Sequence, residues 1–343
     1  MKKYNIAILG ATGAVGQEFL KLIAERNFPF NELKLLASKR SAGKIIEFMG
    51  KNYTVEEATP DSFEEVQIAL FAGGAASKIF APEAVKRGAV VIDNSSSFRM
   101  DPQVPLVVPE VNPQAIKNHK GIIANPNCST IIMVMALKAI YDRVKIKRIV
   151  VSTYQAVSGA GKEAIDELTE QVKAIVENRP VEAKILPSAS LPKHYQIAFN
   201  LIPHIDVFVE DDYTKEEMKM VNETHKILDD YTIGITATTV RVPVYRSHAE
   251  SVNLELAGAL SAAEAKELLA AFPGVTVQDN PAEMSYPMPL FTSNLNDVYV
   301  GRIRPDYSVD YGLNLWVVGD QIRKGAALNA LQIAEYMIDQ KLV

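Results

Sequence analysis

The N-terminal segment decides the fold: the apolar run YNIAIL (residues 4–9) leads directly into GATGAVG (residues 10–16). An apolar run that ends at glycine predicts a buried parallel strand. Residues 15–26 have helical spacing, with an apolar face made of Phe19, Leu20, Leu22 and Ile23. A strand, a glycine-rich turn and a helix in this order are typical of a pyrophosphate site, because backbone N–H groups at the helix N-terminus face the phosphate. The GxxGxxG spacing is a weak signal alone, since a tight turn that packs a helix on a sheet also explains it.

The same alternation continues through the first third of the chain. Further strands are predicted at residues 33–37, 68–72 and 89–93, with a helix at residues 77–87. Strands that alternate with helices predict a parallel, doubly wound sheet.

The pattern changes after about residue 130, where a strongly apolar helix is predicted at residues 129–141. Longer strands then predict a mixed or antiparallel sheet, and they cover residues 146–155, 236–244, 251–256, 299–305 and 313–318. Residues 179–203 hold several prolines and predict an extended excursion. The last segment, residues 322–340, is an amphipathic helix that can return to cover the first domain.

Length and composition narrow the class of protein. The chain has 343 residues, which at roughly 150 residues per domain predicts about two domains. The net charge of −5 argues against nucleic acid or an anionic membrane as the main partner, because both need a basic face. The single cysteine excludes an internal disulfide, and neither a signal peptide nor a membrane span is apparent. We therefore expect a cytoplasmic protein without a metal site.

The end of the second predicted strand bears on the nucleotide. A site that prefers NAD places Asp or Glu here, where it binds the ribose 2′-hydroxyl. This chain instead has Ser38-Lys39-Arg40-Ser41. Cationic and hydroxyl groups favour the 2′-phosphate of NADP, although a solvated basic turn has the same sequence.

Two further residues carry candidate chemistry. Cys128 lies in NPNCST (residues 125–130), directly before the apolar helix, where the helix dipole favours the nucleophilic thiolate. Its alternative is a small buried hydrophobic residue. Among the five histidines, His248 lies in a polar loop between two predicted strands, which is a usual position for a catalytic group.

Several longer motifs resemble one family, the aspartate-β-semialdehyde dehydrogenases of the bacterial type. The resemblance runs essentially end to end, from GATGAVG to GDQIRKGAALNALQIAE (residues 319–335). Its most specific segments are DNSSSFRM (93–100), NPNCST, TYQAVSGAGK (153–162), EEMK (216–219) and VRVPVYRSHAES (240–251). One departure is Ala249, because many relatives carry serine after the histidine.

The resemblance implies an α/β fold like that of glyceraldehyde-3-phosphate dehydrogenase. A Rossmann-type NADP-binding domain would cover residues 1–127 and 322–343, and an α+β catalytic and dimerisation domain would cover residues 128–321. The implied catalytic residues are Cys128 as nucleophile, His248 as acid/base and Gln155 as the group that orients the thioester. The implied phosphate ligands are Arg99, Asn127 and Lys219, while Glu216 would bind the substrate ammonium and Arg241 its α-carboxylate. The implied NADP contacts are Gly10, Ala11, Thr12, Gly13, Ala14, Val15, Arg40, Ser41, Ser158, Gly159 and Gln321.

The resemblance also implies the reaction, a reductive dephosphorylation of L-β-aspartyl phosphate by NADPH that passes through a thioester on Cys128. The product, L-aspartate-β-semialdehyde, leads to lysine, threonine, methionine and diaminopimelate, and the enzyme would be a homodimer. These roles fit the residue types, since Arg241 offers a bidentate fork to a carboxylate and paired cations suit a phosphate. By spacing alone, however, Glu216 and Lys219 are better explained as a surface salt bridge.

Two other functions stay open from the sequence. N-acetyl-γ-glutamyl-phosphate reductase shares the glycine loop and the cysteine, but its acetylated amine is neutral and gives Glu216 no purpose. A non-catalytic NADP(H) sensor would explain the glycine loop and Arg40. It would leave Cys128, Gln155 and His248 without a joint role.

Overall fold

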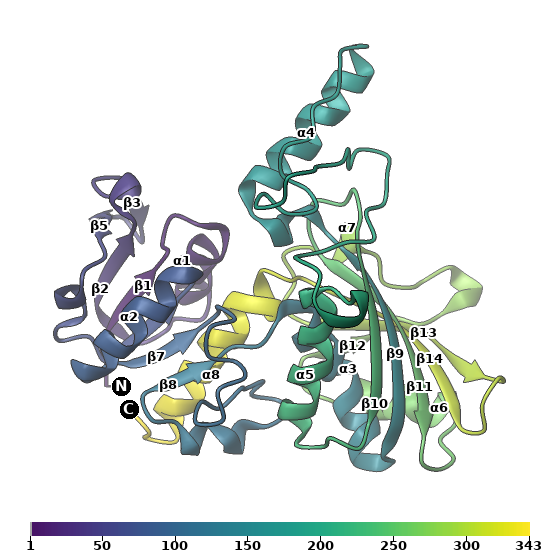
Figure 1. Cartoon of the computed structure of the whole chain (residues 1–343). Helices are drawn as coiled ribbons and strands as arrows, with labels where there is room; N and C mark the ends of the chain where they lie inside the picture. Colours follow the sequence, from purple (N-terminus) through teal and green to yellow (C-terminus); the bar gives the residue numbers. More distant parts are fainter. Residues whose placement is uncertain (1) are drawn as a thin grey trace. The chain divides into compact units, whose positions relative to one another are not determined.

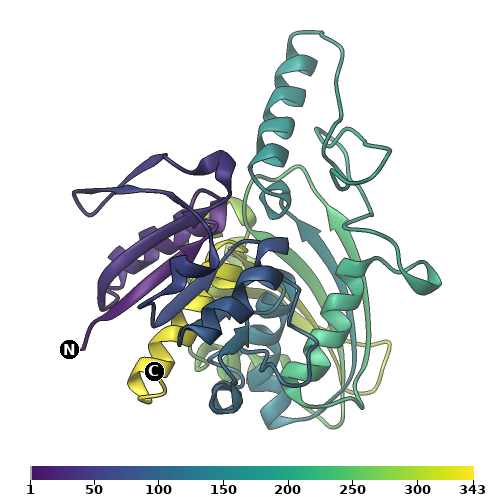
Figure 2. The ribbon, with the colours of Figure 1, turned by 60° about the vertical axis from the view of Figure 1, so that its left-hand side comes forward.

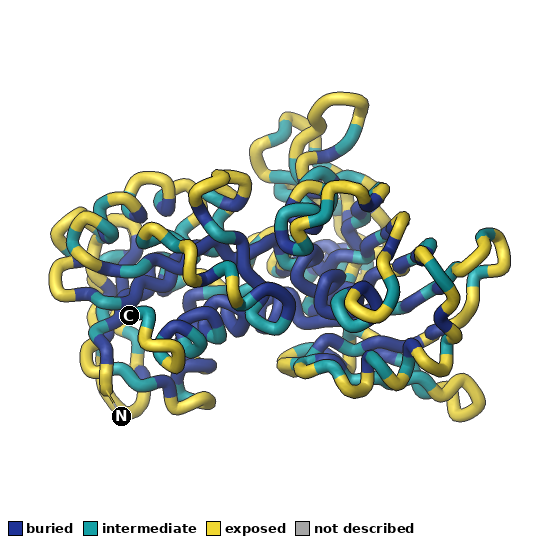
Figure 3. The backbone as a smooth tube through the Cα atoms, turned by 90° about the horizontal axis from the view of Figure 1, so that it is seen from below, coloured by how far each residue is buried: buried dark blue, intermediate teal, exposed yellow. Residues whose placement is uncertain are grey.

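The computed structural model describes residues 2–343, which form two compact units (Figure 1). The first unit comprises the chain up to Asn127, together with Lys226–Leu228 and Gly325–Val343. The second comprises Cys128–His225 and Asp229–Lys324. In both, buried residues run through the strands and helices, and exposed residues are concentrated in the connections (Figure 3).

The first unit is built on a six-stranded sheet in the order β5-β2-β1-β6-β7-β8, in which every pair of neighbours is parallel. Its strands are β1 (Tyr4–Leu9), β2 (Phe30–Ala37), β5 (Glu56–Glu57), β6 (Ile68–Phe71), β7 (Val90–Asp93) and β8 (Ile122–Ala124). A hairpin of β3 (Ile45–Phe48) and β4 (Lys51–Thr54) lies outside this sheet.

Helices cover both faces of this sheet, and the alternation of side chains along β1 shows why. Ile6 and Ile8 belong to one buried cluster with α1 (Ala14–Glu25) and α8 (Leu328–Asp339). Ala7 and Leu9 point to the other face and belong to a second cluster with α2 (Ala75–Lys86). Because successive side chains of a strand point to opposite faces, a run that is apolar throughout requires cover on both sides. The expected doubly wound sheet is therefore confirmed.

The second unit is built on a mixed six-stranded sheet in the order β10-β9-β11-β14-β13-β12. Its strands are β9 (Ile146–Gln155), β10 (Gly234–Arg241), β11 (His248–Leu256), β12 (Val275–Val277), β13 (Val298–Asp306) and β14 (Gly312–Gly319). The first two are parallel, whereas β11 is antiparallel to both β9 and β14. The expected mixed sheet is also confirmed.

The helices of the second unit are α3 (Cys128–Arg143), α4 (Lys162–Val176), α5 (Lys215–Leu228, whose last three residues belong to the first unit), α6 (Ala262–Ala270) and α7 (Pro289–Thr292). Eleven of the sixteen residues of α3 are buried, and this helix packs on β9, β11, β13 and β14. The predicted excursion follows α4 and lies beside it as an extended segment (Figure 2). Short helical turns occupy residues 39–41, 60–63, 113–118, 157–160, 210–212, 281–283 and 323–327.

Most expected elements are present with ends that differ by a few residues, but two differences have a physical cause. The strand expected to reach Val244 ends at Arg241, two residues before Pro243, which has no N–H for a ladder. The sequence predicted His248 in a loop, but it is the first residue of β11 and is fully buried. The polar residues around His248 are typical of a loop, because its burial comes from distant parts of the unit that the local sequence does not show. Within residues 2–343, no helix is both long enough and apolar enough for a membrane crossing.

The glycine loop depends on missing Cβ atoms at two positions. Gly10 has φ +85°, and a Cβ there would lie 2.9 Å from the carbonyl oxygen of Ala72. A Cβ on Gly16 would lie 2.2 Å from the carbonyl oxygen of Gly10. The start of α1 thus packs directly on the turn that precedes it, which only glycine allows.

This packing predicts the cost of one methyl group. Gly16→Ala should lower the free energy of unfolding by about 2 kcal/mol or more, because the clash is with backbone that cannot rotate away. Urea unfolding followed by circular dichroism measures this change. Gly258→Ala is the matched control, since its Cβ would meet only Val144, at 3.8 Å, and it should change stability by less than about 0.5 kcal/mol. Equal changes in both variants would contradict this account of the loop.

Candidate functional site

Strand register in the second unit places three of the predicted residues in one row. Arg241, the last residue of β10, pairs with Gln155, the last residue of β9. On the other side of β9, Ala249 pairs with Tyr154, so His248 lies level with Gln155. Paired residues point to the same face, and all three side chains are buried, with 4%, 1% and 0% exposed for Arg241, Gln155 and His248. Residues separated by more than ninety positions in the chain thus form one polar row.

A backbone hydrogen bond fixes the tautomer of His248. The N–H of Ala156 donates to Nδ1 of His248 over 3.1 Å, so Nδ1 must carry a lone pair. The neutral ring then carries its proton on Nε2, which is buried and has no hydrogen-bond partner among residues 2–343. Burial, reinforced by the positive charge of Arg241, lowers the pKa of His248 to about 3. The Nε2–H group of this neutral ring is therefore available to donate a hydrogen bond to a bound ligand.

Arg241 is anchored on the same residue. Its Nη1 donates to the carbonyl oxygen of Ala156 over 2.8 Å, while its Nε has no hydrogen-bond partner among the described residues. Burial lowers the pKa of the guanidinium, and the negative charges of Glu216 and Cys128 act to raise it. Arg241 therefore lies within electrostatic range of both groups, with donors left for an anionic ligand.

Cys128 is the first residue of α3 and is half-buried. The helix has sixteen residues, and the positive end of its dipole lies at its N-terminus, beside the thiol. This position favours the thiolate over the thiol. The local sequence predicted this placement, because NPN ends one element and the apolar run begins the next.

Glu216 and Lys219 form a buried ion pair, so the surface salt bridge that spacing favoured is wrong. Lys219 Nζ lies 2.9 Å from Glu216 Oε2, and the two side chains are 18% and 7% exposed. The other carboxylate oxygen of Glu216 accepts a 3.1 Å hydrogen bond from Gln155 Nε2, which joins the pair to the row. Lys219 Nζ also lies 2.9 Å from Asp206 Oδ2. Burial acts to lower the pKa of Lys219, but the two carboxylates outweigh it and hold this pKa above its ordinary value.

Helix α5 presents Glu216 and Lys219 because its first turn is bonded to β10, beside which it lies (Figure 1). Thr214 caps the helix in a reciprocal capping box with Glu217. The second oxygen of Glu217 accepts from the N–H of Thr239 over 3.0 Å. These buried bonds fix the helix end, so Glu216 in the first turn and Lys219 in the next are held in place beside the row.

Ser158 and Gln321 are joined by a short hydrogen bond from the Gln321 amide, whose oxygen accepts from the N–H of Ser247 over 2.8 Å. Gly159, the next residue, is exposed, and a Cβ there would lie 3.3 Å from His248 Nε2 and 3.0 Å from Arg241 Nη1. The absent side chain keeps open the space in front of both groups. The structure therefore places these three predicted residues beside the row.

The remaining predicted residues belong to the first unit. Gly13 and Ala14 are exposed at the start of α1, which has no side-chain cap and no acidic residue in its first turn. Thr12 Oγ1 lies 3.4 Å from Ser41 Oγ, so the glycine loop and the turn after β2 are neighbours. Arg40, in that turn, is exposed. Open N–H groups beside an exposed cation fit a phosphorylated dinucleotide.

Arg99 and Asn127 are buried in the first unit, at 8% and 5% exposed. The Arg99 guanidinium donates to the carbonyl oxygens of Asn125 and Asn94 over 3.0 and 2.8 Å. Asn127 is the residue before Cys128, so it accompanies the start of α3 in the chain.

Sequence reasoning missed a second buried row behind the first. Glu250 pairs with Thr153, and both are fully buried. Thr153 Oγ1 donates to Gln155 Oε1 over 3.3 Å, while the Glu250 carboxylate has no partner among the described residues. Burial raises the pKa of Glu250, two residues beyond His248, well above its ordinary value and so favours its neutral form. Alternation along β11 places Glu250 on the same face as His248. The strand predicted from the sequence began only at residue 251, so Glu250 lay outside it.

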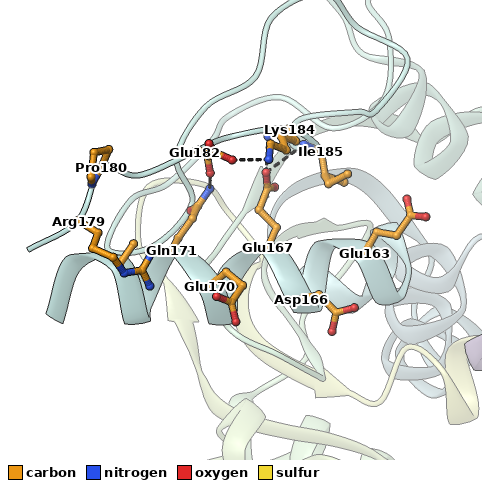
Figure 4. A pocket seen from close by; sticks show the side chains of 11 residues that line it. Glu163, Asp166, Glu167, Glu170, Gln171, Arg179, Pro180, Glu182, Lys184 and Ile185 are labelled. Atoms are coloured by element: carbon orange, nitrogen blue, oxygen red, sulfur yellow. Dashed lines mark hydrogen bonds and ion pairs between the residues drawn. The ribbon is translucent and has the colours of Figure 1, made fainter. Parts of the chain in front are cut away.

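A separate hollow of about 640 Å³ lies along α4 (Figure 4). Acidic side chains of the helix line it, together with Arg179, Glu182 and Lys184 of the excursion. Glu167 accepts from three successive backbone N–H groups there, at residues 184–186. These bonds hold the excursion against the helix, and no cysteine, serine or histidine is found among the described residues that line the hollow.

Comparisons with known proteins show the family to which the chain belongs. A family model described as "Semialdehyde dehydrogenase, NAD binding domain" matches residues 5–119, and one described as "Semialdehyde dehydrogenase, dimerisation domain" matches residues 137–324. The chain is 56% identical to the aspartate-semialdehyde dehydrogenase of Aquifex aeolicus, over 99% of both chains. It is 53% identical to that of Bacillus subtilis, again over 99% of both.

Solved structures give the same result. The chain matches aspartate semialdehyde dehydrogenase II of Vibrio cholerae, crystallised in complex with ASA, with a TM-score of 0.93 and 47% identity over 99% of each chain. The two domain models define the class as semialdehyde dehydrogenases, which are oxidoreductases with an NAD(P)-binding domain. Within that class, the chain belongs to the aspartate-semialdehyde dehydrogenase family.

The tautomer of His248 can be measured directly. In protein labelled with ¹⁵N-histidine, the His248 ring should show the neutral Nε2–H pattern from about pH 8 down to about pH 5, assigned by its loss in His248→Asn. An ordinary histidine becomes imidazolium over this interval. An imidazolium signal with a midpoint near pH 6.5 would contradict the assignment.

The same shift has a consequence for stability. The unfolded chain protonates this histidine near pH 6.5, whereas the native protein does so only near pH 3. The unfolded state therefore binds more protons between these values, and native stability falls as the pH is lowered through them.

Proposed function

We propose that this chain catalyses the NADPH-dependent reductive dephosphorylation of L-β-aspartyl phosphate to L-aspartate-β-semialdehyde, on the route to lysine, threonine, methionine and diaminopimelate. One observation supports this most: the row of Arg241, Gln155 and His248 is joined to a buried Glu216–Lys219 pair. Such a set offers a fork for a carboxylate, an anion for an ammonium, a cation for a phosphate and a neutral proton donor.

Substrate recognition follows from these charges. Arg241 would take the α-carboxylate, because its Nε has no other partner among the described residues. Glu216 would take the substrate ammonium, since it is the carboxylate that is joined to the row through Gln155. Lys219 would take the phosphate, with Arg99 and Asn127 of the first unit assigned to the same group by their motifs.

Chemistry begins at Cys128, whose thiolate attacks the acyl carbon while the bond to the phosphate oxygen breaks. Gln155 orients the thioester that results, through its place in the row. NADPH, when bound, supplies the hydride that reduces this thioester. His248 holds its Nε2 proton at the oxyanion that develops on the acyl oxygen, and the sulfur–carbon bond then breaks to restore the thiolate. Because His248 is neutral, the Cys128 thiolate does not depend on an imidazolium ion for its stability and relies on its position at the start of α3.

NADP, rather than NAD, is the cofactor we propose. Gly10 to Val15 would cradle the pyrophosphate, and Arg40 with Ser41 would hold the ribose 2′-phosphate. Ser158, Gly159 and Gln321 would contact the cofactor in the second unit, where Gly159 leaves space beside His248. Residues 1–127 and 322–343 would then serve as the NADP-binding domain, and residues 128–321 as the catalytic and dimerisation domain.

We propose a homodimer as the working form. Helix α3 packs on one face of the mixed sheet. Tyr154 and Trp316 point to the other face, are half-buried, and lie with ring centroids 5.5 Å apart. An aromatic pair on such a face is suited to contact a second copy of the dimerisation domain.

The reverse reaction tests the function. Semialdehyde, NADP and phosphate together should give NADPH, seen by its absorbance, and omission of phosphate should abolish this. Cys128→Ser should lower turnover by about a thousandfold or more, because a serine hydroxyl at this position has no general base to activate it, and NADP affinity should be unchanged. Activity with N-acetylglutamate semialdehyde alone would instead identify the sister reductase. Tight NADP binding without either activity would identify a sensor.

Cofactor preference has its own test. Arg40→Ala should raise KM for NADP by about tenfold or more and leave KM for NAD nearly unchanged, since only NADP carries the 2′-phosphate. Lys39→Ala is the matched control, because it removes a neighbouring charge from the same turn, and it should change KM for NADP less than Arg40→Ala does. Equal losses for both cofactors would remove Arg40 from the ribose site.

A further inference from the structure

Asp206 is a charged residue of the site that has no role in the proposed recognition of substrate. Its Oδ2 lies 2.9 Å from Lys219 Nζ, the same distance as Glu216 Oε2. Lys219 thus contacts two carboxylates, and the Asp206 side chain is 31% exposed. The proposed function requires the same ammonium to bind a phosphate dianion.

The segment that carries Asp206 is bonded on both sides. Ile202 exchanges two backbone hydrogen bonds with Arg241, of 3.0 and 2.8 Å. Val207 accepts from the N–H of Lys215, the first residue of α5, over 2.8 Å. Between these anchors Asp206 has φ +70°, and its second oxygen accepts from the N–H of Val207 over 2.9 Å. The carboxylate is therefore held at Lys219 and is not a mobile surface group.

A charge count shows what this carboxylate does. The cations Arg241 and Lys219 face three anions, which are Glu216, Asp206 and the Cys128 thiolate, while His248 is neutral. In the proposed function, Arg241 is neutralised by the substrate α-carboxylate and Glu216 by the substrate ammonium. Lys219, which shares the phosphate with Arg99 in the proposed function, has to receive a dianion beside the fixed negative charge of Asp206 that opposes it.

We propose that Asp206 is a specificity-determining residue of the phosphate site, which holds Lys219 in place and limits the affinity of that site for phosphate. This inference rests on the proposed function. The carboxylate keeps the lysine extended while no phosphate is bound. It also opposes the dianion, so phosphate expelled by Cys128 leaves rather than stays.

The test is the affinity for phosphate in the reverse reaction. Asp206→Asn should lower KM for phosphate by at least about threefold, since one negative charge near a dianion is removed while the side-chain shape is kept. KM for the semialdehyde and for NADP should change by less than about twofold. The inhibition constant of phosphate in the forward reaction should fall by the same factor as its KM, because both report one site.

Two controls make the result specific. Asp206→Glu retains the charge and should keep the wild-type KM for phosphate. Asp166→Asn removes an equal charge from the exposed side of α4, where it should change nothing. An unchanged or higher KM for phosphate in Asp206→Asn would overturn the proposal, as would a parallel rise in all three KM values, which indicates a structural role only. Wild-type protein without phosphate-dependent activity would reject the proposed function itself, so the two failures are distinguishable.

Discussion

The pairing register of β10, β9 and β11 is the constraint on which the site depends. It brings Arg241 and Gln155 together as the last residues of parallel strands, and it sets His248 level with them from an antiparallel strand. A shift of one residue in either pair would turn a side chain to the other face, where Tyr154 lies. Buried side chains on both rows of this face, which include Val151 and Val252, make such a shift costly. The hydrophobic core of the second unit therefore specifies the geometry of its polar row.

Residue 156 links the chemistry to that register. Its N–H donates to His248 and its carbonyl oxygen accepts from Arg241, so one alanine orients both side chains. The backbone at this point has just left β9, and its polar groups are free of the ladder. Backbone groups cost no side-chain entropy when they hold a ring or a guanidinium, which makes them effective positioning groups. A histidine held in this way serves as a neutral donor, comparable in principle to a preorganised oxyanion hole.

Electrostatics in the site form one connected chain. From Asp206 through Lys219 and Glu216 to Gln155, each group contacts the next within 3.1 Å. A network of this kind in a partly buried site is sensitive to each added or removed charge, because water screens it only weakly. In the proposed reaction, the substrate would add an ammonium, a carboxylate and a phosphate to this network. The charges already present would then influence how tightly each of those groups is bound.

The sequence alone determined the class of fold and singled out most of the residues to which we assign the chemistry. The strand–glycine–helix opening, the continuous apolar run of β1 and the start of α3 near Cys128 are local patterns, which a sequence shows directly. The matching motifs added the roles that we propose for Gln155, Glu216, Arg241 and His248. The tertiary structure decided what these groups are physically. It made His248 a buried strand residue with a fixed tautomer, turned an i,i+3 pair into a buried ion pair, and brought Asp206 to Lys219. Burial, tautomer and charge partners arise from strands and loops far apart in the chain, and no spacing rule encodes the contacts between them.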